Sequence, residues 1–191
     1  MINDIKQYAK LNNVPIMEDD GINYLINFIK TNNIKSILEI GSAIGYSAIM
    51  MAMIDNNIKI TTIEKDKNRC LEAVTNINNC QLTNQIKVIY GNALDDIEIN
   101  NTFDLIFIDA AKSKSQTFFE KYQSYLNPKG IIITDNINLH GLVKDSSLTK
   151  NKNTLKLINK IKSYIDFLKT NNHFITEFID IGDGLSISRK K

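Results

Sequence analysis

The sequence predicts an α/β fold, in which a seven-stranded, mostly parallel sheet with an antiparallel C-terminal strand carries helices on both faces. Short β-branched runs alternate with longer segments of helical period, as in parallel sheets covered by helices. Most of these runs are continuously apolar, which is typical of strands buried on both faces. The chain closes with "FITEFIDIGDGLSIS", two strands joined at a Gly-Asp-Gly turn, and this hairpin makes the sheet mixed.

The segments before and between the predicted strands have the period of amphipathic helices. Ile22, Leu25, Ile26 and Ile29 recur at i, i+3, i+4 and i+7, which predicts a helix ahead of the first strand. The expected parallel strands are Ser36–Ile40, Ile58–Ile63, Ile86–Tyr90, Asp104–Ile108 and Ile131–Thr134. Further helices are expected near Tyr46–Asp55, Lys67–Asn79 and Thr149–Thr170.

An aromatic stripe precedes the fifth strand, and its helical spacing favours core packing over a cofactor site. It consists of Phe118, Phe119, Tyr122, Tyr125 and Leu126. Pro128 and Gly130 are expected to end this helix. No repeat, low-complexity tract or long linker interrupts the chain, so residues 1–191 are predicted to form a single domain.

Composition places the chain among ordinary globular proteins. Of its 191 residues 43% are hydrophobic and 23% charged, and the net charge of +2 neither demands nor excludes a polyanionic partner. Cys70 and Cys80 lack a CxxC or histidine-rich context, so free thiols in a reducing cytosol are expected. With no signal-peptide pattern and no run of 18 apolar residues, we expect a cytoplasmic protein without a membrane partner.

A glycine-rich turn follows the first predicted strand, in "ILEIGSAIGYSAIMMA". Gly41 and Gly45 lie where the carboxyl end of a strand and the start of a helix face a ligand in open α/β sheets. A glycine turn by itself is weak evidence. Glu64, roughly 20 residues further at the end of the second strand, can accept hydrogen bonds from both ribose hydroxyls. Together the two features indicate an adenosine ligand.

The turn suits an adenosine ligand without phosphates. Ala43 stands where a dinucleotide-binding turn has its middle glycine, which disfavours NAD and fits S-adenosylmethionine. Glu39 is expected to attract the ammonium group of this cofactor, and Ser47 to donate to its carboxylate, unless Ser47 only caps the helix. In "YGNAL", Asn92 and Ala93 are candidates for the adenine edge, although this segment also reads as a plain turn.

Three oxygen-bearing side chains end the fourth and fifth strands. Asp109 follows the fourth strand, and Asp135 with Asn136 follows the fifth. Two carboxylates and one amide oxygen suit Mg²⁺ or a similar divalent cation, whereas zinc is disfavoured without Cys or His. The alternative is that both aspartates cap the loops that follow them.

These segments, taken together, resemble a known family. "LEIGSAIGYSA", "TTIEKD", "GNAL", "FDLIFIDAAK", "IIITDN" and "IGDGLSIS" occur in the order found in the cation-dependent O-methyltransferases that include the catechol and caffeoyl-coenzyme A enzymes. The resemblance runs from Val14 to Arg189 and implies a Rossmann-like class I methyltransferase fold. Through "VPIM", "AIGYSA", "FIDAAK" and "DGL", the sequence most resembles the bacterial methyltransferases of 5-hydroxyuridine in tRNA.

The resemblance implies roles for individual positions. Asp109, Asp135 and Asn136 would bind the cation, and Glu64 the ribose. Contacts with S-adenosylmethionine are implied for Met17, Ser47, Asn92, Ala93 and Asp109. Two departures stand out: Asn92 replaces the usual Asp, and the chain begins close to "VPIM", so an N-terminal helix of longer relatives is expected to be partly absent.

The expected chemistry is an in-line displacement that places a nucleophilic oxygen opposite the sulfonium. Orientation of this kind supplies about 7 to 11 kcal/mol in favourable systems. Lys112 matches the catalytic lysine of the family and would accept the hydroxyl proton, although a lysine here also fits a solvated surface.

The expected acceptor is 5-hydroxyuridine in tRNA. Like a catechol, 5-hydroxyuracil presents two neighbouring oxygens. The segment between His140 and Thr170 contains seven lysines and two aspartates, an excess of five positive charges. This excess suits binding to RNA phosphates, but it also fits a solvated helix face. The lysines are Lys144, Lys150, Lys152, Lys156, Lys160, Lys162 and Lys169.

Other functions remain open on sequence grounds. A small catechol-like phenol is the alternative acceptor, and a noncatalytic adenosine-binding protein is a different class on the same fold. An NAD-dependent dehydrogenase is disfavoured by Ala43. A homodimer is expected, with no interface identified.

Overall fold

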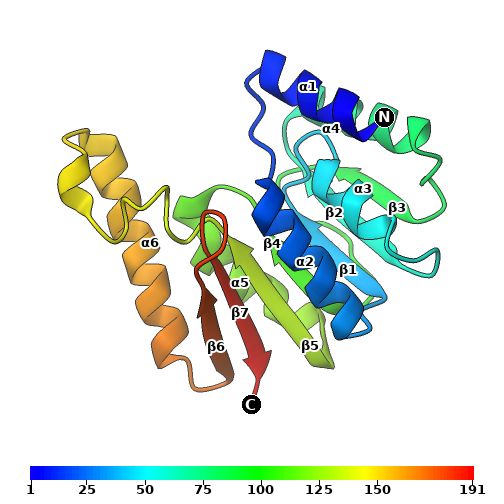
Figure 1. Cartoon of the computed structure of the whole chain (residues 1–191). Coiled ribbons are helices and arrows are strands. Elements are labelled where there is room, and N and C mark those ends of the chain that lie inside the picture. Colours follow the sequence, from blue (N-terminus) through cyan, green and yellow to red (C-terminus); the bar gives the residue numbers. More distant parts are fainter. The chain divides into compact units, whose positions relative to one another are not determined.

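The computed structural model describes all residues from 1 to 191, and its internal contacts divide the chain into two compact units (Figure 1). Unit 1 comprises Met1–Asn101 and unit 2 comprises Thr102–Lys191. The seven strands follow the order β3-β2-β1-β4-β5-β7-β6, and β7 pairs antiparallel with both of its neighbours, which confirms the predicted fold class. Whether residues 1–191 fold as one domain stays a prediction.

Unit 1 is an all-parallel set of three strands with four helices. Its elements are α1 (Ile2–Leu11), α2 (Asp19–Thr31), β1 (Ser36–Ile40), α3 (Tyr46–Ala52), β2 (Lys59–Glu64), α4 (Lys67–Asn79) and β3 (Ile86–Tyr90). β2 pairs with β1 and with β3, and the apolar strand side chains Ile37, Leu38 and Ile60 are buried. α4 begins where the Asp66 side chain accepts a hydrogen bond from the Arg69 N–H, because a capping carboxylate satisfies a free donor of the first turn.

Unit 2 contains the remaining strands and the longest helix. Its elements are β4 (Phe103–Ile108), the 3₁₀ turn η1 (Lys112–Lys114), α5 (Ser115–Tyr122), η2 (Gln123–Tyr125), β5 (Leu126–Asp135), η3 (Ser146–Leu148), α6 (Lys152–Thr170), β6 (Phe174–Ile179) and β7 (Leu185–Lys190). Most of the aromatic stripe is core, as predicted: Phe118, Phe119, Tyr122 and Leu126 are buried, and Tyr125 is half-buried. The Phe119 ring centroid lies 5.0 Å from that of Phe174 and 5.5 Å from that of Phe167.

The main differences from the sequence analysis are an additional helix and the start of β5. α1 was not predicted. β5 begins at Leu126, ahead of Pro128 and Gly130, which had been expected to precede the strand. The register jumps from Phe103↔Leu126 to Leu105↔Ile131, so the two breakers lie in a bulge where no ladder hydrogen bond is required of the proline.

Two further observations concern the thiols and the helices. Cys70 and Cys80 are both free. No helix of the structure combines the length and the apolar character that a membrane crossing requires.

The bulge yields a stability prediction. A Cβ at Gly130 would lie 2.8 Å from Leu126 Cδ2 and 2.9 Å from the Phe103 carbonyl oxygen, so Gly130→Ala is expected to destabilise the protein by about 1 to 3 kcal/mol. Urea unfolding measures the change. Gly91→Ala is the control, since its Cβ would meet nothing closer than Ile97 Cδ1 at 3.4 Å. Equal stability of the two variants would contradict the packing of the bulge.

Candidate active site

In unit 1 the glycine turn and the end of β2 are joined directly. Gly41, Ala43 and Gly45 have φ of 95°, 45° and 83°, so the turn uses the left-handed region that glycine adopts at least cost. The Ala43 N–H donates to Glu64 Oε2 at 2.9 Å, and the Asp66 N–H donates to Glu64 Oε1 at 2.8 Å. The structure thus brings Glu64 to the turn, as the sequence analysis expected.

Below the turn, the Glu39 carboxylate is fully buried. Its two oxygens accept hydrogen bonds from Ser47 Oγ and Thr62 Oγ1, each at 2.5 Å. Ser47 lies on the first turn of α3 but is not its cap, because Gly45 holds that position. Glu39 therefore orients the Ser47 hydroxyl. A direct contact between Glu39 and an ammonium group stays a prediction.

The turn also contains a hydroxyl without a partner. Ser42 Oγ is buried and makes no hydrogen bond in the structure. Since a buried unpaired polar group costs about 1 to 3 kcal/mol, a ligand that reaches this hydroxyl would be favoured. The residues of the turn therefore fit a bound polar ligand.

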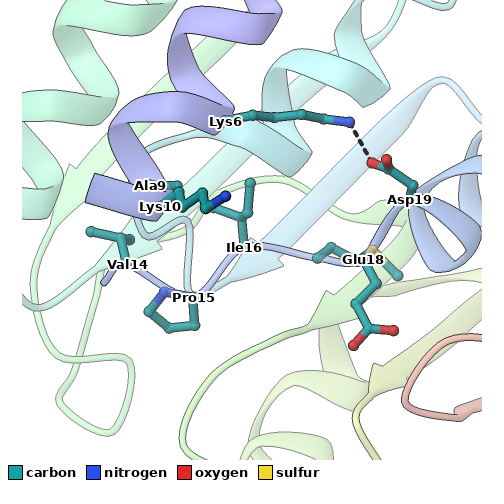
Figure 2. A pocket seen from close by; sticks show the side chains of 9 residues that line it. Lys6, Ala9, Lys10, Val14, Pro15, Ile16, Glu18 and Asp19 are labelled. Atoms are coloured by element: carbon teal, nitrogen blue, oxygen red, sulfur yellow. Dashed lines mark hydrogen bonds and ion pairs between the residues drawn. The ribbon is translucent and has the colours of Figure 1, made fainter. Parts of the chain in front are cut away.

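Met17, implied by the resemblance, lines a hollow of about 480 Å³. The hollow is bordered by Lys6, Ala9, Lys10, Val14, Pro15, Ile16, Met17, Glu18 and Asp19. Lys6 on α1 makes an ion pair with Asp19 at the start of α2, drawn as the dashed line in Figure 2. Lys6 Nζ also lies 5.7 Å from the ring centroid of Tyr46. One lysine thus ties α1 to the beginnings of α2 and α3.

The "YGNAL" segment is a turn after β3. The Leu94 N–H donates to Asn92 Oδ1 at 3.1 Å, and Asn92 Nδ2 lies 3.3 Å from Asp95 Oδ1. Ala93 is buried. The local bonds of Asn92 fix its side chain, and the adenine contact expected of Asn92 and Ala93 stays a prediction.

In unit 2 the two strand-end aspartates lie side by side, as expected from adjacent parallel strands. Ile108 and Thr134 are partners in the β4–β5 register, and Asp109 and Asp135 follow them directly. Lys112 Nζ donates to Asp109 Oδ1 at 2.7 Å, with both side chains about one-fifth exposed. A lysine, a carboxylate and a second carboxylate thus form one group, and Lys112 is not a freely solvated side chain.

Asp135 is the most deeply buried acid of this group, with 5% of its surface exposed. Burial, followed by the negative charge of Asp109, raises the pKa of Asp135 to about 7, while Lys112 acts in the opposite direction. The Asn136 N–H donates to Asp135 Oδ1 at 2.7 Å, so Asp135 also caps the turn that follows it. The capping role and a ligand role use different lone pairs.

The loop after β5 has a partner in the turn between β6 and β7 that the sequence analysis missed. Asn136 Nδ2 donates to Asp183 Oδ2 at 3.2 Å, and the His140 N–H donates to Asp183 Oδ1. Asp183 had been read only as part of the Gly-Asp-Gly turn. Its sole sequence signal was an acidic residue in the "IGDGLSIS" segment of the resemblance.

The donor set of unit 2 fits a divalent cation. Asp109, Asp135 and Asn136 supply hard oxygen atoms. The two neighbouring carboxylates are balanced by only one lysine, so the group can accommodate a further positive charge. The structure contains no group of three or more His, Cys, Asp or Glu side chains suited to a metal. The predicted set includes an amide, and its metal binding stays a prediction.

A strand order of this kind, with a glycine turn after β1 and an acid at the end of β2, defines a Rossmann-like class I methyltransferase fold. Comparison with known proteins makes the class specific. Residues 2–191 match the O-methyltransferase family. The chain therefore belongs to that O-methyltransferase family, to which the catechol and caffeoyl-coenzyme A types belong.

Individual relatives agree with this assignment. A catechol O-methyltransferase of Niastella koreensis is 34% identical over 122 residues, a match that covers 61% of this chain and 55% of that relative's length. The crystal structure of a candidate caffeoyl-CoA O-methyltransferase from Staphylococcus aureus has a TM-score of 0.94 at 38% identity, covering 100% of this chain and 92% of that chain. An O-methyltransferase from Bacillus cereus in complex with SAH shares the fold, with a TM-score of 0.84 at 23% identity over 100% of this chain and 90% of that chain.

The burial of Asp135 yields a prediction about pH. Because folding raises the pKa of Asp135, this carboxyl lowers stability as the pH rises from about 4 to about 7. Asp135→Asn removes this pH-dependent loss of stability. In the presence of a chelator, the unfolding free energy of the variant is expected to exceed that of the wild type by on the order of a few kcal/mol near pH 8, and the difference is expected to vanish near pH 4.

Asp145→Asn serves as the control with the opposite sign. Hydrogen bonds from Ser147 lower the pKa of Asp145, so this substitution is expected to reduce stability near pH 8. Urea unfolding at both pH values measures the two variants. An Asp135→Asn effect that is independent of pH would contradict the burial of a titrating carboxyl at this position.

Proposed function

We propose that the protein transfers the methyl group of S-adenosylmethionine to the 5-hydroxyl of 5-hydroxyuridine in tRNA, with the help of Mg²⁺ or a similar cation. The observation that carries the proposal is the group formed by Asp109, Lys112 and the buried Asp135. It offers oxygen ligands for a cation and a lysine beside them. Membership of the O-methyltransferase family supports the reaction type.

The methyl donor is assigned to the residues of unit 1. The Bacillus cereus relative binds SAH, the demethylated product of this donor. Glu64 would accept the ribose hydroxyls, since each of its oxygens accepts one backbone N–H and has a second lone pair. Ser47, held by Glu39, would orient the amino-acid end, while Gly41, Met17, Asn92 and Ala93 would complete the contacts.

The cation is assigned to Asp109, Asp135 and Asn136. When bound, Mg²⁺ supplies a Lewis acid that favours the oxyanion form of an acidic hydroxyl and fixes its position. The same two carboxylates are those whose burial and mutual repulsion raise the pKa of Asp135. A cation there would relieve the repulsion.

The proposed transfer forms a bond between the acceptor oxygen and the methyl carbon and breaks the bond between that carbon and sulfur. The electron pair of the broken bond stays on sulfur, which becomes a thioether. The hydroxyl proton goes to Lys112 in its neutral form. In the structure Lys112 donates to Asp109, so its service as a base requires prior release of one proton.

RNA recognition is assigned to lysines on and just before α6. Lys152, Lys156 and Lys160 are exposed and recur every four residues, so they form one row away from the buried Ile161 and Tyr164. Lys144 is different, because it pairs with Asp180 at 2.7 Å. A row of three unburied ammonium groups suits consecutive phosphates.

A small phenol is the second candidate acceptor. The names of two relatives, a catechol and a candidate caffeoyl-CoA O-methyltransferase, favour it. A catechol and 5-hydroxyuracil both present two adjacent oxygens, so the unit 2 group serves either. The row of Lys152, Lys156 and Lys160 would be needed only for an RNA acceptor, not for a small phenol.

Nucleoside mass spectrometry tests the proposal. Hydroxyuridine-containing tRNA incubated with the protein, S-adenosylmethionine and Mg²⁺ is expected to gain 5-methoxyuridine, and a chelator is expected to abolish the gain. Lys112→Met is expected to lower the rate by about 10²- to 10⁴-fold, the usual contribution of a positioned base. Conversion of free catechols but not of tRNA would move the assignment to a small phenolic acceptor.

Charge reversal tests the lysine row. Lys152→Glu combined with Lys156→Glu is expected to raise KM for tRNA and to reduce the slope of log affinity against log salt by about 1 to 2, because each lost phosphate contact lowers that slope by roughly 0.7 to 0.9. Activity on the free 5-hydroxyuridine nucleoside should stay unchanged. Lys30→Glu with Lys129→Glu carries the same change of net charge at exposed sites elsewhere and is the control. Equal effects of the two pairs on tRNA would remove α6 from the proposal.

A further inference from the structure

We propose that Asp183 is a positioning residue that fixes the side-chain amide of Asn136 with its carbonyl oxygen turned away from Asp183, ready to serve as a cation ligand. The inference rests on the proposed function, in which Asp109, Asp135 and Asn136 hold a cation. It gives Asp183 a role that neither the sequence motifs nor the family assignment supplied. Asp183 and Asn136 are 47 positions apart in the chain.

Both carboxylate oxygens of Asp183 are used by the loop after β5. Oδ2 accepts from Asn136 Nδ2 at 3.2 Å, and Oδ1 accepts from the backbone N–H of His140. His140 Nδ1 lies 3.8 Å from the same Oδ1. The Asp183 side chain is 3% exposed. Both oxygens of this buried carboxylate therefore act on the loop after β5.

The chemistry of the two groups fixes the orientation of the amide. An ionised carboxylate only accepts hydrogen bonds, whereas the Asn amide has one donating and one accepting end. The NH₂ group of Asn136 must therefore face Asp183, and its carbonyl oxygen must lie on the opposite side of the amide. Without Asp183 the amide would be free to turn over, and half of its orientations would offer a donor to the cation.

The loop needs this support because its backbone is strained. Asn136, Leu139 and His140 have φ of 59°, 47° and 51°, which non-glycine residues seldom adopt. The turn before β7 holds them from the other side: the Ile137 N–H donates to the Gly184 carbonyl at 3.1 Å, and the Asn138 N–H to the Asp183 carbonyl at 2.9 Å. Gly184 permits the approach, since a Cβ there would lie 2.7 Å from the Asn138 side chain.

Asp180 provides an internal comparison within the same turn. It accepts from Asn138 Nδ2 at 2.8 Å and from Lys144 Nζ at 2.7 Å, and it makes no hydrogen bond with Asn136. Its side chain is 69% exposed. Asp180 therefore ties the loop to the turn without touching a proposed ligand, which makes it a matched control.

The test measures Mn²⁺ affinity of the full chain by electron paramagnetic resonance, with no methyl donor or acceptor present. Asp183→Asn is expected to raise the dissociation constant for Mn²⁺ about 10- to 100-fold, the usual cost of losing a residue that orients a metal ligand. Asp180→Asn is expected to change it by less than about two-fold, as for an exposed pair. In an Asn136→Ala background, Asp183→Asn is expected to add little, because it acts through the residue already removed.

A second measurement uses the wild-type protein and does not depend on a variant that folds. In ¹⁵N-resolved spectra the Asn136 side-chain amide is expected to show one downfield, slowly exchanging proton, which reports its hydrogen bond to Asp183. Two protons with solvent-like shifts and exchange would overturn the proposal.

The outcomes separate the inference from the function on which it rests. Tight Mn²⁺ binding by wild type and equally tight binding by Asp183→Asn would overturn the role of Asp183 and leave the cation site standing. Additive losses from Asn136→Ala and Asp183→Asn would also overturn it, because they would mean a general structural role. An absence of Mn²⁺ binding by the wild type would overturn the cation site itself, and the role of Asp183 with it.

Discussion

Burial of the Asp135 carboxylate beside Asp109 is the constraint on which the chemistry of unit 2 depends. The β4–β5 register places the two acids at neighbouring strand ends, and the surrounding apolar strands remove water from one of them. Removing an ion from water costs several kcal/mol even after relaxation. A nearby positive charge offsets this cost. The attraction between a cation and the carboxylates is also stronger here, because the effective dielectric constant is lower than in water.

Lys112 supplies part of the positive charge that the two carboxylates require, and it also has a second, proposed role. Its ammonium group donates to Asp109 Oδ1 at 2.7 Å, which keeps the lysine beside a proposed cation ligand. The pair thus offsets part of the negative charge, and Lys112 must release a proton from it before it can act as the proposed base. In unit 1 the Glu64 side chain likewise has two roles. Its carboxylate holds the glycine turn through the Ala43 N–H, and it is the proposed ribose ligand.

Much of the fold could be predicted because most of its strands are continuous apolar runs in the sequence. β1 and β3 have the predicted bounds, while β2 is displaced by one residue. β5 was misplaced at its start because Pro128 and Gly130 read as breakers, whereas tertiary pairing with Phe103 accommodates them in a bulge. α1 was not predicted: no element was assigned ahead of "VPIM", although Ile5 and Ala9, four residues apart, form the buried side of this helix.

Within the site, local relations were easier to predict than distant ones. Asp109 and Lys112 share one short motif, and parallel topology brings Asp135 next to Asp109. Asp183 could not be found by spacing, because its partners lie across the loop and the hairpin rather than along one element. The fully buried state of Glu39 likewise depends on the hydroxyls of Ser47 and Thr62, which meet only in the fold.

Anomalous scattering from crystals soaked in Mn²⁺ tests whether the strand-end carboxylates of unit 2 bind a divalent cation, as we propose. A single strong anomalous peak is expected within bonding distance of oxygen atoms of Asp109, Asp135 and Asn136. A peak that avoids these side chains, or no peak while Lys112 keeps its place against Asp109, would contradict the proposal.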